Sequence, residues 1–171
     1  MNHARKLALF EENVLPHLNA AYNLARWLTG DREHAEDIVQ EAYLRAFRSF
    51  DSFRGQDGRA WLLAVVRNTC YSWVKKEKGY QQVEFDEEVH SAVDESPHAE
   101  SMLLSEASLA SLQGCLEALP LEFREAIVLR ELEGLSYKEI AGIARVPVGT
   151  VMSRLSRGRK RLQKCLAGVL T

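Results

Sequence analysis

Near the C-terminus of this 171-residue chain, five polar side chains are spaced 3, 1, 3 and 4 residues apart. They are Thr150, Ser153, Arg154, Arg157 and Arg161. In an α-helix these intervals put all five on one face, turned away from Val151 and Leu155. Arginine can hold the major-groove edge of guanine with two hydrogen bonds, and threonine or serine can reach bases or phosphates. We therefore expect this face to bind duplex DNA.

The other interpretation of this segment is a solvated basic helix without a partner. Residues 145–171 contain seven Lys or Arg and no acid, so their charges would repel one another unless an anion were bound. That imbalance favours a polyanion as the partner.

A second group of residues combines aromatic rings, cations and an amide. It consists of Phe53, Arg54, Trp61, Asn68, Lys75 and Lys76. Rings and guanidinium planes can stack on unstacked bases, while amines meet phosphates, so the group suits single-stranded DNA. The alternative for Trp61, and for Trp73 further along, is a core position, and the helical pattern alone favours the core for both.

Several functional classes lack support in the sequence. Cys70, Cys115 and Cys165 lie 45 and 50 residues apart, which is not metal-ligand spacing, and we expect reduced core thiols in a cytoplasmic protein. The histidines form no H-E-x-x-H motif, and the glycines of residues 55–58 lack P-loop spacing. We expect no catalytic residue, no metal and no cofactor. The longest apolar run, residues 60–66, is far shorter than the roughly 20 residues of a membrane span, so no membrane insertion is expected.

Charge is distributed unevenly, although the net value is only −2. Residues 1–80 carry 12 basic and 10 acidic side chains, residues 81–118 carry nine acids and no Lys or Arg, and residues 119–171 carry 10 basic and five acidic side chains. The first part of the acidic stretch has few large apolar residues and no helical or strand period. The sequence therefore predicts two small helical domains, 1–80 and 106–171, joined by a flexible acidic linker over 81–105.

Helical periodicity dominates both domains, and the fold class is expected to be all-α. In the first domain apolar residues follow helical steps from Leu7 to Leu28 through Leu18, with a break near Pro16. Gly30 ends that helix and Asp31 can cap the next one, which runs to about residue 50. A third long helix covers residues 59–78, and its expected buried stripe is Leu62, Val65, Val66, Thr69, Cys70 and Trp73.

The second domain has the pattern of a helix-turn-helix. A helix from residue 119 to 132 is followed by Gly134, and residues 136–139 (Ser-Tyr-Lys-Glu) form a capping box for a short helix. The three-residue turn 145–147 then leads to a basic helix from Val148 to about Leu166. Two helices of this kind joined by a tight turn are typical of DNA-binding domains.

These residues resemble the extracytoplasmic-function (ECF) group of bacterial RNA polymerase sigma factors. Residues 31–47 (DREHAEDIVQEAYLRAF) are similar to the polymerase-binding helix of that family. Residues 59–62 (RAWL) and 66–68 (VRN) are similar to its promoter-melting helix. Three further stretches resemble its C-terminal domain: residues 118–120 (ALP), 135–141 (LSYKEIA) and 149–155 (GTVMSRL).

The resemblance implies a role for each group of residues. The clamp helices of the polymerase largest subunit would contact one face of the second helix: Asp37, Gln40, Glu41, Leu44 and Arg45. The loop of residues 53–58 would capture a base flipped from the minus-ten element, with Asn68 among its contacts and Lys75 and Lys76 along the strand. The basic helix would read the minus-thirty-five element. The linker would enter the active-site and RNA-exit channel of the polymerase, or act as a plain tether.

As a whole, the resemblance implies a sigma factor that binds core RNA polymerase, including its flap, and starts transcription of a stress- or signal-responsive gene set. Its partners would be polymerase, promoter DNA and an anti-sigma factor, and it would not be an enzyme. The alternative is a stand-alone helix-turn-helix regulator whose N-terminal half senses a signal or dimerises. An all-helical metal or redox enzyme is disfavoured because ligand pairs are missing.

Overall fold

The computed structural model describes residues 2–55, 57–79 and 109–170, and the expected linker, 81–105, lies outside these ranges. Every regular element in the described ranges is helical, which confirms the all-α expectation. The chain divides into two compact units, one centred on the helices up to residue 78 and the other on most of the helical segments after residue 108.

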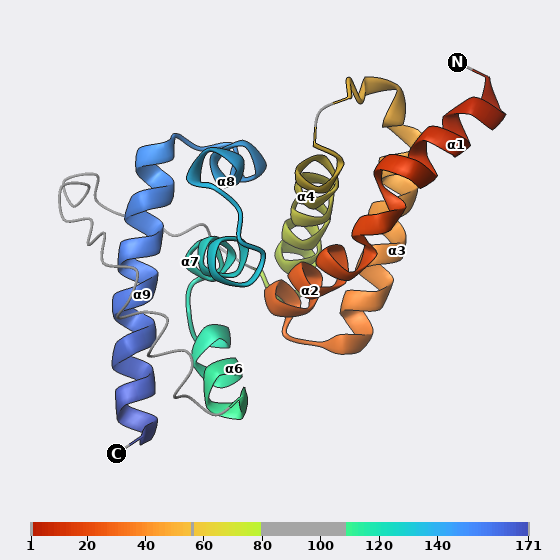
Figure 1. Cartoon of the computed structure of the whole chain (residues 1–171). Coiled ribbons are helices and arrows are strands. Elements are labelled where there is room, and N and C mark those ends of the chain that lie inside the picture. The colour runs from red at the N-terminus through yellow and green to blue at the C-terminus, as the bar shows by residue number, and fades with distance from the viewer. Residues whose placement is uncertain (1, 56, 80–108, 171) are drawn as a thin grey trace. The chain divides into compact units, whose positions relative to one another are not determined.

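The N-terminal unit is built from long helices separated by short 3₁₀ turns (Figure 1). In chain order these are α1 (His3–Asn13), η1 (Leu15–His17), α2 (Leu18–Thr29), α3 (Arg32–Arg48), η2 (Phe50–Ser52) and α4 (Gly58–Lys78). The expected break occurs at Pro16, inside η1. Gly30 ends α2 in a left-handed conformation with φ of 76°, and Asp31 Oδ1 accepts a hydrogen bond of 2.8 Å from the Glu33 amide. The predicted stop and cap are both confirmed.

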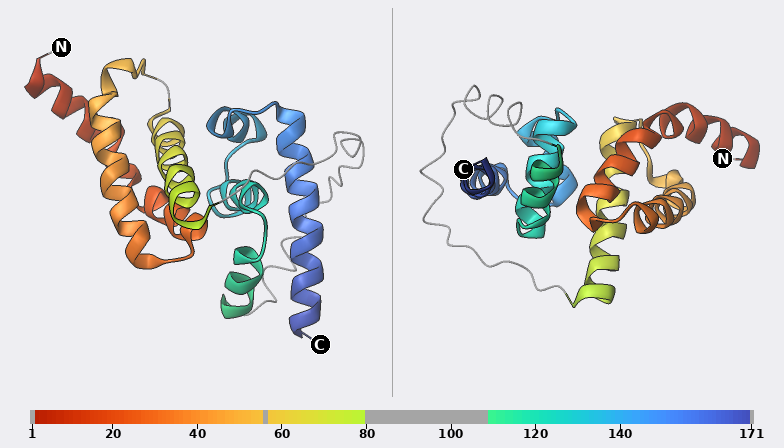
Figure 2. Two further views of the ribbon diagram at one scale, coloured as in Figure 1. Left: turned by 180° about the vertical axis from the view of Figure 1, so that it is seen from behind. Right: turned by 90° about the horizontal axis from the view of Figure 1, so that it is seen from below.

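Helices α2, α3 and α4 pack against one another, and the N-terminal end of α1 extends beyond them (Figures 1 and 2). Their shared core is apolar and nearly inaccessible to water. It includes Leu24, Leu28, Ile38, Phe50, Leu62 and Leu63. Phe10 joins α1 to this core through edge-on ring contacts with Phe47 and Phe50, at centroid distances of 5.3 and 5.5 Å.

Two parts of the expected core differ from the structure. Leu7 and Leu18, expected to face inward, are 41% and 50% exposed, because the break at Pro16 prevents one apolar stripe from continuing through both helices. In α4, Val65 and Trp73 are only half-buried. Leu63 and Val74 are buried as well, since α4 packs on both α2 and α3 and needs a wide apolar face.

In the C-terminal unit the shorter helices lie along one side of the long last helix (Figures 1 and 2). Its elements are α6 (Leu109–Glu117), α7 (Leu121–Ile127), the π-helical turn η4 (Val128–Leu132), α8 (Tyr137–Ala144) and α9 (Val148–Leu170). Helix α6 was not predicted, because the acidic composition of residues 81–118 obscured the apolar spacing at its end. Helix α9 is about one turn longer than expected. The capping box at Ser136 is confirmed.

Helices α6 and α7 pack on α9, and Gly158 of α9 faces α7. A Cβ atom at this position would lie 3.2 Å from Ile127 Cγ1 and 3.3 Å from Phe123 Cβ, so glycine allows α7 and α9 to come close. A short ion pair adds to this contact, with 2.9 Å between Arg159 Nη2 and Glu131 Oε1.

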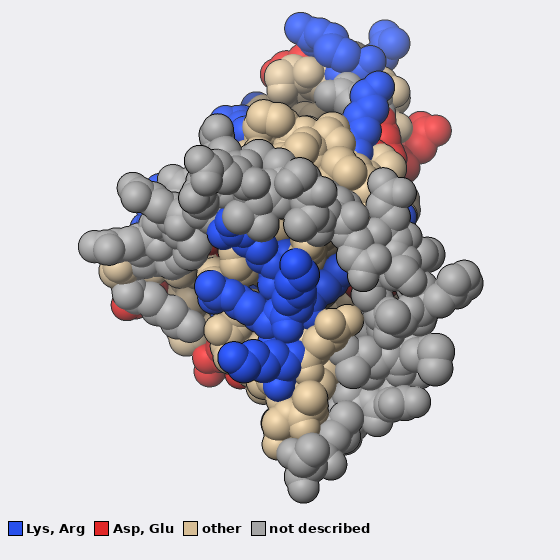
Figure 3. All heavy atoms as spheres, turned by 90° about the vertical axis from the view of Figure 1, so that its left-hand side faces the viewer, with Lys and Arg blue, Asp and Glu red and all other residues tan. Residues whose placement is uncertain are grey.

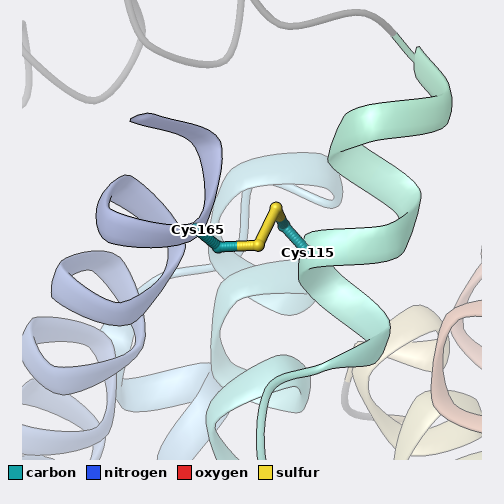
Figure 4. Close-up of a disulfide and its surroundings, with 2 residues drawn as sticks. All are labelled: Cys115 and Cys165. Atoms are coloured by element: carbon teal, nitrogen blue, oxygen red, sulfur yellow. A yellow bond between two sulfur atoms is a disulfide. The ribbon is translucent and has the colours of Figure 1, made fainter. Parts of the chain in front are cut away.

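Two of the three cysteines form a disulfide, which corrects the expectation of three reduced thiols. Cys115 near the end of α6 is bonded to Cys165 in α9, with the Cα atoms 5.7 Å apart (Figure 4). Cys70 is not part of the disulfide and is buried in α4. The sequence could not indicate this pairing, because 50 residues separate the two cysteines and only the packing of α6 on α9 brings them together.

Candidate nucleic-acid and protein interfaces

The turn between α8 and α9 is defined by local hydrogen bonds. The Ser136 hydroxyl accepts a bond of 3.1 Å from the Glu139 amide, and the Glu139 carboxylate accepts one of 3.0 Å from the Ser136 amide. Arg145 ends α8 in a left-handed conformation with φ of 59°, a rare one for a residue with a Cβ. The chain thus reverses over Arg145–Pro147 and enters α9, as a helix-turn-helix requires.

The expected reading face of α9 is only partly open. Arg161 is exposed, and Thr150 and Arg157 are half-buried. Ser153 and Arg154 are 2% and 5% exposed, so the expectation that all five side chains point outward is wrong for these two. Helical spacing gives only the direction in which a side chain leaves the helix, whereas exposure depends on every segment that covers that direction. Both side chains make contacts within the chain.

Basic side chains nevertheless gather along α9. Lys160, Arg161 and Lys164 are exposed, and Figure 3 shows Lys and Arg clustered on the side that α9 occupies in Figure 1. The guanidinium of Arg161 lies 5.3 Å from the centre of the Phe123 ring, which orients it. A cationic surface of this kind suits the phosphates of a duplex.

The loop before α4 brings the predicted aromatic residues together. Phe53 stacks on the buried Phe50 with centroids 5.1 Å apart, and Trp61 meets Phe53 edge-on at 5.5 Å. Phe53 and Trp61 are both half-buried, so each side chain packs partly against the core and is partly accessible to solvent. Arg54 is exposed, and its Nη1 donates a hydrogen bond of 2.8 Å to the Asp51 carbonyl. The cluster thus places partly accessible aromatic rings beside a cation, a combination on which a flipped base can stack.

Further polar groups follow along α4. Asn68 is half-buried, and Lys75 and Lys76 are exposed about two turns later. The sequence-based prediction did not include Tyr71, whose ring centre lies 3.7 Å from the guanidinium carbon of Arg67. The spacing of four residues between an arginine and a tyrosine was the available signal.

The five predicted protein-binding residues lie together on the outer face of α3. Asp37, Gln40, Glu41, Leu44 and Arg45 are all exposed. The Arg45 guanidinium pairs with the Glu41 carboxylate at 2.8 Å, and Leu44 is 58% exposed. A large apolar side chain surrounded by paired charges on an open face is typical of a protein-binding surface.

An apolar groove of about 430 Å³, missed from the sequence, borders this face. Its lining is Leu15, Leu18, Val39, Gln40, Tyr43 and Leu44. Leu15 is 43% exposed, so the groove lies open to solvent. The Tyr43 hydroxyl is buried with no hydrogen-bond partner in the described structure, and burial raises the pKa of this phenol to about 12.

Among the described residues, no group of three or more His, Cys, Asp or Glu is placed to hold a metal ion. None of the helices in the described ranges is long and apolar enough to span a bilayer.

The chain matches two protein-family models, in the order that the sequence predicted. "Sigma-70 region 2" covers residues 14–80 and "Sigma-70, region 4" covers residues 109–162. The first match spans α2 to α4 with the α3 face, the groove and the aromatic cluster. The second spans α6 to α8 and most of α9.

Curated relatives and a solved structure agree with these models. The chain is 35% identical to "ECF RNA polymerase sigma factor SigE" of Mycolicibacterium smegmatis, over 92% of this chain and 62% of that longer protein. It is 33% identical to "RNA polymerase sigma-H factor" of Pseudomonas aeruginosa, over 94% of this chain and 88% of the relative. The sigma factor RpoE of Bartonella quintana, solved in complex with the anti-sigma factor NepR, is 30% identical, with a TM-score of 0.69 over 92% of this chain and 96% of that one.

Proposed function

Because the chain belongs to the ECF group of RNA polymerase sigma factors and directs the polymerase in promoter recognition, we propose that its two units divide this task. The N-terminal unit, residues 1–80, binds core polymerase and opens the minus-ten element. The C-terminal unit, residues 106–171, reads the minus-thirty-five element. Sigma factors are not enzymes, so the work is done by binding energy. The observation that carries the proposal is the coexistence, in one chain, of an open protein-binding face and two nucleic-acid surfaces.

Polymerase binding is assigned to the α3 face together with the groove beside it. The exposed Leu44 and the groove leucines provide apolar area, and Asp37, Glu41 and Arg45 surround them with charge. A helix of the polymerase clamp with one apolar stripe and a polar rim would fit such a surface. The groove extends the predicted contact from α3 to the start of α2.

Strand opening is assigned to the aromatic cluster and the polar side of α4. Flipping a base out of the duplex costs about a few kcal/mol, and stacking on a side chain returns about 1–3 kcal/mol per base. Phe53 and Trp61 offer the rings, Arg54 and Asn68 offer hydrogen bonds, and Lys75 and Lys76 meet the backbone phosphates. The free energy of flipping the base and the free energy of stacking it are similar in size, so strand opening depends on the polymerase holding the DNA in place.

Reading of the minus-thirty-five element is assigned to α9. Thr150, Arg157 and Arg161 are accessible from solvent, and Ser153 and Arg154, which are buried in the structure, lie on the same helix. The two units bind DNA weakly when apart and strongly when polymerase holds both at the promoter, through effective concentration. The acidic residues 81–105 are the tether between them and can also enter the polymerase channel.

The proposal places the chain in the cytoplasm with polymerase, in contact with both clamp and flap, and under the control of an anti-sigma factor. Control by an anti-sigma factor is supported by the similarity of the chain to an RpoE solved in complex with the anti-sigma factor NepR. An inhibitor that covers the α3 face would exclude polymerase.

The test is promoter-directed transcription with purified full-length chain and core polymerase on genomic fragments. We expect defined start sites that are absent with core alone, and gel shifts of the same fragments only when core is present. Tight binding of an operator by the chain alone, with no gain in transcription, would instead identify a stand-alone helix-turn-helix regulator.

A further inference from the structure

We propose that Cys115 and Cys165 form a redox-active dithiol site that, when oxidised, locks α6 onto the C-terminal half of α9. The structure contains the oxidised form, with the two Cα atoms 5.7 Å apart on facing helices (Figure 4). Cys115 is 2% exposed, whereas Cys165 is half-buried. A small oxidant or reductant can therefore reach the pair from the Cys165 side.

The position of the Cys115–Cys165 disulfide determines which helices it would stabilise. Fifty residues separate the two cysteines, and the loop that they close contains α7, η4, α8 and the DNA-reading half of α9. Helix α6 has nine residues, too few to be stable as an isolated helix, so it depends on its packing against α9. A covalent link at this contact holds the short helix in place and restricts the unfolded chain.

The redox environment of the cytoplasm would make the disulfide reversible, and this part of the inference rests on the proposed function. A sigma factor works beside polymerase in the cytoplasm, where thiols are kept reduced and the disulfides that do form are mostly transient or redox-sensing. In the forward step two thiols lose two electrons and two protons as the S–S bond forms. Hydrogen peroxide accepts them and yields two waters, and a dithiol reductant reverses the step by exchange.

Cys70 provides the matched control. It lies outside the disulfide and is fully buried in α4 of the N-terminal unit, so it should neither join the bond nor react in the folded chain. The Cys70→Ser variant keeps the proposed site, whereas Cys115→Ser and Cys165→Ser each remove it. Because α1 to α4 form a separate unit, their stability serves as an internal reference.

The first experiment compares the full-length chain after dithiothreitol and after hydrogen peroxide. Alkylation and peptide mass spectrometry should find Cys115 linked to Cys165 only after oxidant. Thermal unfolding monitored by hydrogen exchange should show that the α6 and α9 peptides unfold at a temperature about 10 °C higher in the oxidised chain than in the reduced chain. The unfolding temperature of the α2 to α4 peptides should be unchanged. Cys70→Ser should keep this difference and the other two variants should lose it. Equal melting of the wild type in both states, or a bond between two chains, overturns the proposal even if a variant fails to fold.

The second experiment follows transcription with core polymerase as the temperature rises. The oxidised chain should stay active to a temperature about 10 °C higher than the reduced chain, and the Cys115→Ser/Cys165→Ser double variant, treated identically, controls for effects on polymerase. No difference between oxidised and reduced chain overturns the redox site and leaves the sigma function standing. A bond that forms and stabilises α9 in a chain that never starts transcription would instead count against the proposed function.

Discussion

Leu44 on the α3 face offers the sharpest test of polymerase binding. Its side chain is 58% exposed and lines the groove with Leu15 and Leu18. Burying a leucine side chain fully yields about 1.5–3 kcal/mol, so covering the exposed part yields about 1–2 kcal/mol. The Leu44→Ala variant should therefore bind core polymerase about 5- to 30-fold more weakly.

The assay is an equilibrium titration of fluorescently labelled chain with core polymerase. Leu7→Ala is the matched control, because Leu7 is 41% exposed but does not line the groove. Neither variant should lower the melting temperature appreciably, since both side chains are largely outside the core. A change in Kd of less than twofold for Leu44→Ala, or an equal loss for Leu7→Ala, would refute the assignment of the groove and α3 to polymerase.

The same variant separates binding from promoter recognition. If Leu44 acts only through polymerase affinity, transcription by Leu44→Ala should return to the wild-type level when the chain is in large excess over core. A defect that persists at saturation would mean that Leu44 also affects a later step.

Three other perturbations have outcomes that follow from the structure. Gly58→Ala should destabilise the N-terminal unit by about 1–3 kcal/mol, because the new Cβ atom would overlap the Asn13 carbonyl oxygen. As a control, Gly114→Ala should not lower the midpoint of chemical unfolding, because there is open space around Gly114. Arg157→Ala should weaken holoenzyme binding to a minus-thirty-five duplex by about 1–3 kcal/mol and relax specificity at one base pair, and an equal loss on all sequences would mean a phosphate contact instead. The phenol of Tyr43 should have a pKa of about 12 in the folded chain, compared with its ordinary value of 10.0. Between about pH 10 and pH 12 the folded state therefore binds more protons than the unfolded state, and the free energy of unfolding falls as the pH rises through this range. Ultraviolet titration should lose that high step in Tyr43→Phe, which should fold at least as stably because the hydroxyl has no hydrogen-bond partner in the described structure.

Much of the secondary structure could be predicted because its causes lie within a few residues. The break at Pro16, the left-handed Gly30, the Asp31 cap and the capping box at Ser136 each depend on backbone and side-chain groups of one helical turn. The exposed face of α3 was predicted on the same basis, since Asp37 to Arg45 are spaced at helical intervals opposite the apolar stripe.

Exposure and pairing were less predictable, since they depend on segments far apart in the chain. Ser153 and Arg154 were expected to face solvent and are buried, and Leu18 was expected in the core and is half-exposed. Helix α6 was missed because composition, averaged over an acidic stretch, hid a short apolar pattern.

For this protein the sequence alone determined the family, the order of its helices and their ends, because those depend on residue types and on contacts within about four residues. The tertiary structure decided which side chains remain accessible, where the apolar groove lies, and that Cys115 meets Cys165. Those features arise from the packing of helices whose residues are tens of positions apart, and no local spacing specifies how closely such helices approach.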